Sequence, residues 1–124
     1  MSCRLCLLAL LLFLFVPVRV SAQCPGATTS LVPFAMEKLT VSTTPKVLTQ
    51  SIYKPSGVMP ILAMISLESG SIRYAEVGTP TTTDGHPVTA PATFSICGID
   101  SIAAFKAIRT DTDALLTITY YKSK

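Results

Sequence analysis

The most apolar stretch of the chain lies at its N-terminus, where residues 5–16 form an unbroken apolar run. Arg4 puts a positive charge before this run, a proline follows it, and residues 20–22 (Val-Ser-Ala) supply a cleavage site. This order is typical of a secretory signal peptide, and the run is shorter than the ~20 apolar residues that a membrane-spanning helix needs. We therefore predict that residues 1–22 are a signal peptide and that residues 23–124 form a single domain.

Two other fates of the N-terminus remain open from the sequence. The apolar run could stay attached as an uncleaved anchor, although Arg19 lies just beyond it and weakens that interpretation. Cys24 could carry a lipid, but Gln23 stands where a lipoprotein signal has a small residue. A cleaved signal places the protein in the periplasm, in the medium or on the cell surface, without a stable membrane span.

The rest of the chain consists of short apolar or alternating runs separated by turn residues. Residues 60–67 (PILAMISL) are nearly all apolar, which predicts a buried strand, with a short buried helix as the alternative. Residues 114–121 (ALLTITYY) are β-branched, aromatic and alternating, and they predict a strand most clearly. Further strands are expected at residues 37–42, 47–53, 71–77 and 93–97.

One segment has a helical pattern and one reads as a loop. Within residues 101–109, apolar side chains recur at intervals of three, at Ile102, Phe105 and Ile108. This spacing predicts a short helix with Asp100 as its N-cap. Prolines exclude a long helix from residues 78–92 and predict a loop there. Short strands separated by turns at near-regular spacing predict an all-β fold, a small antiparallel β-sandwich of the jelly-roll or immunoglobulin-like type.

The number of cysteines that can form a disulfide in the exported chain depends on removal of the signal peptide. Of the four cysteines, Cys3 and Cys6 lie in the predicted signal, whereas Cys24 and Cys97 remain after it is removed. Two cysteines in an exported chain predict one disulfide. The loop that it closes holds about 70 residues, which is worth about 4 kcal/mol in the chain-entropy model. A pair of free thiols, one of them buried, is the alternative.

The charge balance also changes when the signal is removed. The full chain has a net charge of +3, and loss of Arg4 and Arg19 leaves eight basic and seven acidic residues, a net charge of +1. A nearly neutral domain gives no support for a nucleic-acid partner or for attraction to a membrane surface. The sequence therefore predicts no nucleic-acid binding.

Residue types that catalytic and metal sites use are scarce. His86 is the one histidine, so no histidine pair for zinc can form, and without asparagine there is no N-glycosylation sequon. A hydrolase triad of Ser95, His86 and Asp84 can be drawn, but the chain lacks the G-x-S-x-G motif that would support it. Asp111 and Asp113 are better explained as a polar turn than as a calcium site, which needs six or more oxygens. We expect a protein that is not an enzyme and has no cofactor or metal.

Two neighbouring segments are candidates for contact with a partner. The residues selected are Ile61, Met64 and Ile65 in the apolar run, and Arg73 and Tyr74 in the strand that follows. An apolar run with one exposed face marks an oligomer interface, whereas a run covered on both faces is core. An arginine in mid-strand often covers an interface or an aromatic ring. The expected partner is another copy of this chain or another protein.

The C-terminal half carries a characteristic order of motifs. An Arg-Tyr strand precedes a Gly-Thr-Pro-Thr loop and a Gly-x-Pro, and a Gly-x-Asp then leads into Ala-Phe-Lys-Ala-Ile and a final alternating strand. The positions are Arg73, Tyr74, Gly78, Thr79, Pro80, Thr81, Gly85, Pro87, Gly98, Asp100, Ala104, Phe105, Ala107 and Ile108. Over residues 72–121 the chain resembles a family of small bacteriophage-encoded proteins that are uncharacterised or assigned to the virion.

The resemblance implies a compact β-sandwich that has no catalytic activity and assembles as a structural subunit, with a virion as one location. The predicted signal peptide and Cys97 depart from the family's pattern, and they favour an exported relative or a host-encoded copy. An exported module that recognises a protein or a glycan through its loops is the alternative function. A small hydrolase that uses His86 is the third hypothesis.

Overall fold

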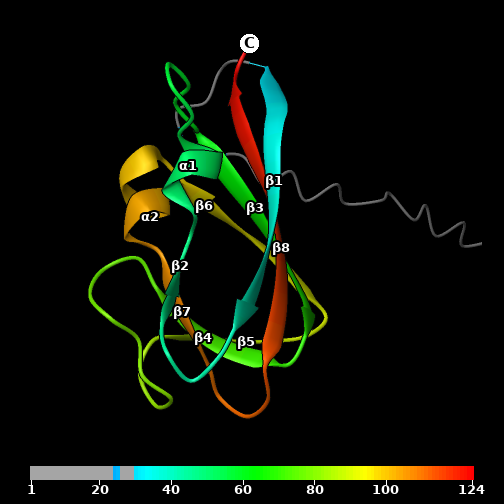
Figure 1. Ribbon diagram of the computed structural model, residues 1–124, viewed down its shortest axis with the longest axis vertical. Coiled ribbons are helices and arrows are strands. Elements are labelled where there is room, and N and C mark those ends of the chain that lie inside the picture. The colour runs from blue at the N-terminus through cyan, green and yellow to red at the C-terminus, as the bar shows by residue number, and fades with distance from the viewer. Residues whose placement is uncertain (1–23, 26–29) are drawn as a thin grey trace, which may run out of the picture.

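The computed structural model describes residues 24–25 and 30–124, and the predicted signal peptide, residues 1–22, lies outside them. Eight strands form two four-stranded antiparallel sheets, and two short helices, α1 (Gln50–Tyr53) and α2 (Ile99–Ala104), lie together beside them (Figure 1). The prediction of a small all-β sandwich is confirmed.

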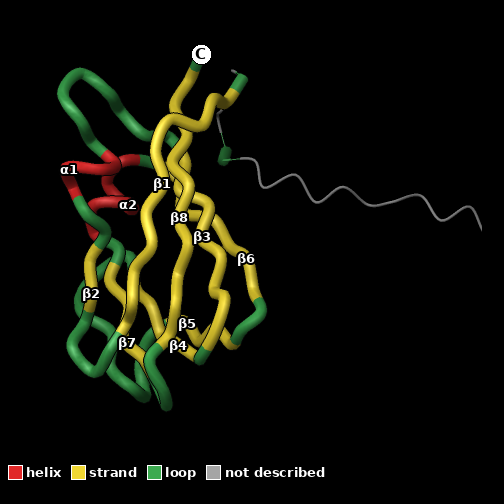
Figure 2. Tube along the Cα trace, turned by 45° about the vertical axis from the view of Figure 1, so that its right-hand side comes forward, coloured by secondary structure: helices red, strands yellow, loops and turns green. Residues whose placement is uncertain are grey.

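Each sheet combines strands from distant parts of the chain. The first sheet contains, in order, β1 (Leu31–Val41), β8 (Ala114–Ser123), β3 (Leu62–Ser69) and β6 (Ala92–Cys97). The second sheet contains, in order, β2 (Lys46–Val47), β7 (Lys106–Arg109), β4 (Ser71–Ala75) and β5 (His86–Thr89). Figure 2 shows the four strands of the first sheet side by side.

The strand pairing distinguishes between the two expected types of sandwich. β1 pairs with β8, β2 with β7, β3 with β6 and β4 with β5, as in one long hairpin that has been folded over into two sheets. Eight strands paired in this way across two sheets form a jelly roll. The fold is therefore the jelly-roll type rather than the immunoglobulin-like type.

The hydrophobic core lies between the sheets, and the register of the first sheet determines which side chains enter it. Residues directly opposite each other on paired strands share a face of the sheet. The rows that point inward are Ala63 with Ile96 and Tyr120, Ile65 with Phe94 and Ile118, and Leu67 with Ala92 and Leu116. Buried side chains of the second sheet and of the chain before β7 join the same cluster, among them Ile72, Ile102, Phe105 and Ala107.

Most of the expected strands are present with small shifts at their ends. The strands expected at residues 60–67, 71–77, 93–97 and 114–121 are β3, β4, β6 and β8. The strand expected at residues 37–42 is the second half of β1, which begins earlier. The buried-helix alternative for residues 60–67 is therefore wrong.

The strand predicted over residues 47–53 is wrong. Pairing with β7 stops after Val47, and the chain then turns into α1, with Thr49 as the N-cap residue. The helical turn buries Tyr53, and the centre of its ring lies 5.9 Å from that of Tyr120. Packing of this tyrosine in the core outweighs the strand propensity of the segment.

The helix predicted over residues 101–109 is wrong in its second half. α2 ends at Ala104, and the following residues form β7, which pairs with β2 on one side and β4 on the other. Ile102 and Ile108 are both buried, but Ile102 belongs to the helix and Ile108 to the strand. The spacing of three therefore spans two elements and does not represent one helical face.

Two smaller expectations also change. Gly98, with a φ of 85°, is the N-cap residue of α2, and Asp100 lies in the first turn instead. The loop predicted over residues 78–92 contains β5, which pairs with β4 and includes Pro87. β5 is an edge strand of the second sheet, where a proline without an N–H group is tolerated.

A disulfide joins Cys24 to Cys97, and their Cα atoms are 5.4 Å apart, as the cysteine count predicts. Cys97 ends β6 and lies opposite Leu62 of β3. The bridge therefore ties the start of the described chain to the first sheet.

Candidate functional site

The structure does not bring the five candidate interface residues to one surface. Ile65 points into the core and has no exposed surface, and Tyr74 is stacked against core aromatic rings. Met64 points away from the core on β3, and Ile61 is half-buried just before that strand. Arg73 lies on the second sheet. Of this set, Met64 alone belongs to the broader surface described next.

The broader surface is the side of the first sheet that faces away from the core, which we call the outer face. Two rows of cross-strand neighbours form its centre, Met36 with Thr119, Met64 and Ser95, and Lys38 with Thr117, Ser66 and Thr93. Thr40 and Leu115 form the next row. Lys38 of the second row is one charged side chain of this surface, and Glu68, which lies on β3 at the register shift beside the third row, is the other.

Threonine and serine hydroxyls on the outer face bond to neighbouring side chains. The hydroxyl oxygens of Ser66 and Thr93 are 3.3 Å apart, within hydrogen-bond distance across β3 and β6. Thr117 on β8 donates a hydrogen bond to the carboxylate of Glu68. This bond directs the Glu68 carboxylate from β3 toward the neighbouring strand, β8.

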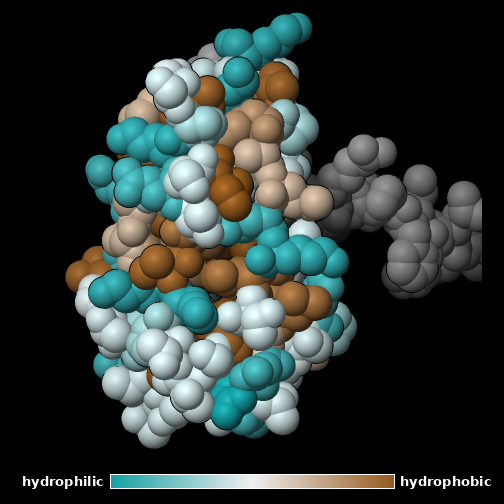
Figure 3. Space-filling view, in the orientation of Figure 1, coloured by the Kyte–Doolittle hydropathy of each residue, from teal (hydrophilic) through white to brown (hydrophobic). Residues whose placement is uncertain are grey.

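Apolar surface also reaches solvent along the β1 side of the molecule. The Met36 side chain is 63% exposed, and Val47 on β2 is 51% exposed. In Figure 3, apolar surface crosses the middle of the molecule, over the part where β1, β2 and β8 lie in the same view, and hydrophilic side chains surround it. The β1 side therefore exposes apolar side chains next to the polar rows of the outer face.

The loop between β4 and β5 is a second candidate, and Arg73 holds it in place. The Arg73 guanidinium donates hydrogen bonds from Nε to the Thr82 carbonyl (3.2 Å) and from Nη1 to the Gly85 carbonyl (2.8 Å). Within the loop, the Asp84 N–H donates to the Thr81 hydroxyl at 3.0 Å. At Gly85, with a φ of 112°, an added Cβ atom would lie 2.9 Å from the Tyr74 carbonyl oxygen. Sequence reasoning missed this positioning role of Arg73.

A hollow of about 290 Å³ lies beside this loop. It is lined by Ala75, Glu76, Val77, Thr79, Pro80, Asp84, Gly85 and His86. Within the described residues, no group of His, Cys, Asp or Glu is arranged to hold a metal ion. Ser95 belongs to the outer face of the first sheet, whereas His86 begins β5 of the second, so the hypothetical triad does not assemble.

Aromatic rings close the sandwich next to the hollow. The Tyr74 ring stacks on Phe94 of the opposite sheet, with ring centres 4.7 Å apart, and also lies 5.6 Å from Phe105 and 5.1 Å from His86. Burial raises the pKa of the Tyr74 hydroxyl, and the negative charge of Glu76 raises it further. Tyr74 and His86 thus join the edge of the hollow to the core.

Glu37 is a buried carboxylate that sequence reasoning did not single out. It is 7% exposed, and it accepts hydrogen bonds from the Tyr120 hydroxyl and from the Thr49 N–H, the latter at 3.1 Å. Burial raises the pKa of the Tyr120 hydroxyl, and the hydrogen bond to Glu37 and the charges of Glu37 and Tyr53 add to the effect. The alternation of residues 37–42, which puts Glu37 on the side of Leu39 and Val41, was the signal that could have identified it.

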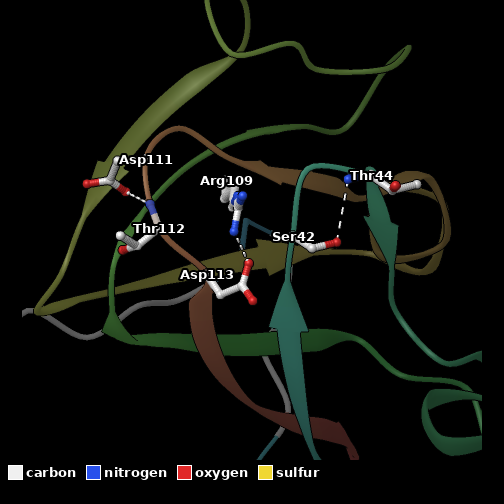
Figure 4. Close-up of polar contacts among 6 residues, drawn as sticks. All are labelled: Ser42, Thr44, Arg109, Asp111, Thr112 and Asp113. Carbon is white, nitrogen blue, oxygen red and sulfur yellow. Dashed lines mark hydrogen bonds and ion pairs between the residues drawn. The ribbon is translucent and has the colours of Figure 1, made fainter.

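The acidic turn before β8 has its polar groups paired (Figure 4). Asp113 forms an ion pair with Arg109, and the Thr112 N–H donates to the Asp111 carboxylate at 2.6 Å. In the neighbouring loop, the Thr44 N–H donates to the Ser42 hydroxyl at 3.5 Å. These contacts fit the interpretation of residues 110–113 as a polar turn.

Comparisons with known proteins give no match that would assign a function to either candidate surface. No protein-family model matches the chain, and no similar curated protein or solved structure is found. Neither α1 nor α2, the helices of the described residues, has the length and apolarity needed to cross a membrane.

Proposed function

We propose that this chain is an exported, non-enzymatic structural subunit that assembles through the outer face of its first sheet. The observation that carries the proposal is the low charge of that face, where Met36 is largely exposed and Lys38 and the adjoining Glu68 are the charged side chains in or beside the three rows. Solvent-facing protein surfaces normally mix charges of both signs, whereas the centres of interfaces are depleted of charge and enriched in methionine.

The fold and the sequence resemblance support the same proposal. Jelly rolls occur in viral capsid domains and in lectins, although a fold alone does not assign a function. The resemblance of residues 72–121 to small phage proteins favours assembly over recognition of a sugar. A small domain buries a modest core, and burying a second surface in an assembly would add to its stability.

Light scattering on the purified protein tests this proposal with two matched substitutions. Met36→Lys places a charge on the outer face and should weaken association about tenfold or more, because a desolvated unpaired charge opposes binding. Val77→Lys alters a hydrophobic residue that is more exposed than Met36, at 90%, in the β4–β5 loop, and association should not change. Equal effects of both substitutions, or none from either, would contradict assembly through the outer face.

A binding module is the second candidate, because one specific feature favours it. The β4–β5 loop is held by Arg73 and surrounds a hollow with two carboxylates, those of Glu76 and Asp84. Such groups accept hydrogen bonds from sugar hydroxyls. Glycan-array binding that is lost in Asp84→Ala and retained in Met36→Lys would favour this function over assembly.

A further inference from the structure

We infer that the outer face binds a second copy of this chain, packed face to face about a two-fold axis that runs parallel to β8. This inference rests on the proposed function and specifies its partner and geometry. Two-fold dimers are the commonest oligomers, and each contact in them occurs twice, so the surface must complement itself. The strand order and register of the outer face meet that requirement.

The strand order determines what the rotation brings together. β8 lies between β1 and β3 in the first sheet, and neighbouring strands are about 4.8 Å apart. A half-turn about an axis along β8 therefore places β1 of one copy over β3 of the other. β8 of one copy then lies over β8 of the other, and its residues face their own counterparts.

The first central row matches apolar side chains in this arrangement. Met36 on β1 and Met64 on β3 both lie opposite Thr119 of β8, one on each side. The rotation therefore puts Met36 of one copy over Met64 of the other, twice. The exposed Met36 side chain is then covered by the flexible thioether chain of Met64, a pairing that packs well without strict geometry.

The second central row matches charges of opposite sign. Lys38 on β1 and Ser66 on β3 lie opposite Thr117, and the Thr117 hydroxyl holds the Glu68 carboxylate near this row. The rotation brings Lys38 of one copy toward Glu68 of the other, again twice. Within the described residues, the single ion pair is that of Arg109 with Asp113, so neither Lys38 nor Glu68 has an ionic partner there, and the two can pair between copies.

The alternative two-fold axis, perpendicular to the strands, gives a poorer match. When it lies midway between the two central rows, it places β1 over β1 and exchanges the rows, so that Met36 of one copy faces Lys38 of the other. An ammonium group packed against a thioether has no ionic partner, and burying an unpaired charge is costly. Complementarity of charge and apolarity therefore favours the axis along β8 over this one.

Site-directed cross-linking tests the geometry with two matched threonine substitutions. In Thr119→Cys the new thiol lies beside the proposed axis, so a short bis-maleimide should link two copies efficiently. In Thr93→Cys the thiol lies on β6 of the same face, two strands away from the axis. Strand spacing puts it about 19 Å from the same thiol in the other copy, so it should give little cross-linked dimer. Cys24 and Cys97 are joined to each other, and the protein is used after removal of the predicted signal peptide with Cys3 and Cys6, so no native thiol competes for the reagent.

A charge exchange provides a second measurement that does not depend on cross-linking. Lys38→Glu and Glu68→Lys each create two like-charge contacts and should each weaken dimerisation tenfold or more, whereas the double variant should restore it. Efficient linking of Thr119→Cys together with this rescue supports the inference. If the protein associates but Thr93→Cys links as well as Thr119→Cys, or the double variant stays weak, the geometry is overturned and the proposed function stands. A protein that remains monomeric overturns both.

Discussion

Among single residues, Glu37 is the one buried polar or charged residue of the described structure. Its carboxylate lies between the sheets and is satisfied by the Tyr120 hydroxyl of β8 and the Thr49 N–H at the start of α1. A buried acceptor that loses a partner costs more than the bond itself contributes, because the group cannot recover its hydration. The three residues therefore connect β1, β8 and α1 through one carboxylate.

Substituting Tyr120→Phe should lower the free energy of unfolding by about 1–3 kcal/mol, because it removes a partner of the buried carboxylate. Tyr121→Phe is the matched control, since Tyr121 is the next residue on the same strand and points to the other side. Urea denaturation of both variants measures the difference. Equal stability of the two variants would show that the Glu37–Tyr120 contact does not stabilise the fold.

Alkaline pH should destabilise the protein through its buried tyrosine hydroxyls. The pKa values of Tyr74 and Tyr120 are raised in the folded state, so the unfolded chain, with a tyrosine pKa of about 10, loses the proton first. The stabilisation is complete below about pH 10 and is lost as the pH rises above it. Melting temperatures between pH 9 and pH 11.5 should fall more steeply in the parent protein than in Tyr120→Phe, and parallel slopes would contradict this assignment.

At the scale of elements, the β4–β5 loop depends on one strand residue. Arg73→Met keeps a long side chain but removes both hydrogen bonds to the loop carbonyls. The amide protons of residues 81–85 should exchange several-fold faster, with a global stability loss of about 1 kcal/mol or less because the contact is partly exposed. Hydrogen-exchange mass spectrometry measures this, and unchanged exchange in the loop would show that it is ordered without Arg73.

Elements formed by regular local patterns could be predicted, and elements set by distant contacts could not. Residues 60–67 and 114–121 contain enough apolar and β-branched residues to specify β3 and β8 by themselves. β7 is a strand because β2 and β4 pair with it on both sides, and no local signal separates Lys106–Arg109 from the preceding helix. α1 likewise forms where Tyr53 must reach Tyr120, a contact between residues far apart in the chain.

At the scale of the whole molecule, the jelly-roll topology creates the candidate site. Met64 was identified from the sequence because it lies in an apolar run, but Met36 and Lys38 reach the same surface only because β1 and β3 both pair with β8. Strand order across distant segments leaves no trace in a local pattern, so the outer face could not be predicted. Arg73 and Tyr74 lie apart from this face, where Arg73 orders a loop and Tyr74 joins the sheets, and their contact with a partner stays a prediction.

Removal of the disulfide should weaken the whole fold rather than one element. The bridge joins residues separated by 73 positions, so the double substitution of Cys24→Ala and Cys97→Ala should cost up to about 4 kcal/mol in the chain-entropy model. Thermal unfolding with and without reductant measures the loss, and the double variant should no longer respond to reductant. Ready alkylation of Cys24 and Cys97 in the untreated protein would contradict the bridge.

The central claim is that copies of this chain assemble through the outer face, and the mass of the protein in solution tests it most directly. Sedimentation equilibrium over a wide range of concentrations should give a mass that rises from one chain to two, with Met36→Lys shifted to markedly higher concentrations. A mass of one chain at every concentration would contradict the account, as would a dimer that forms equally well with the charged side chain in place.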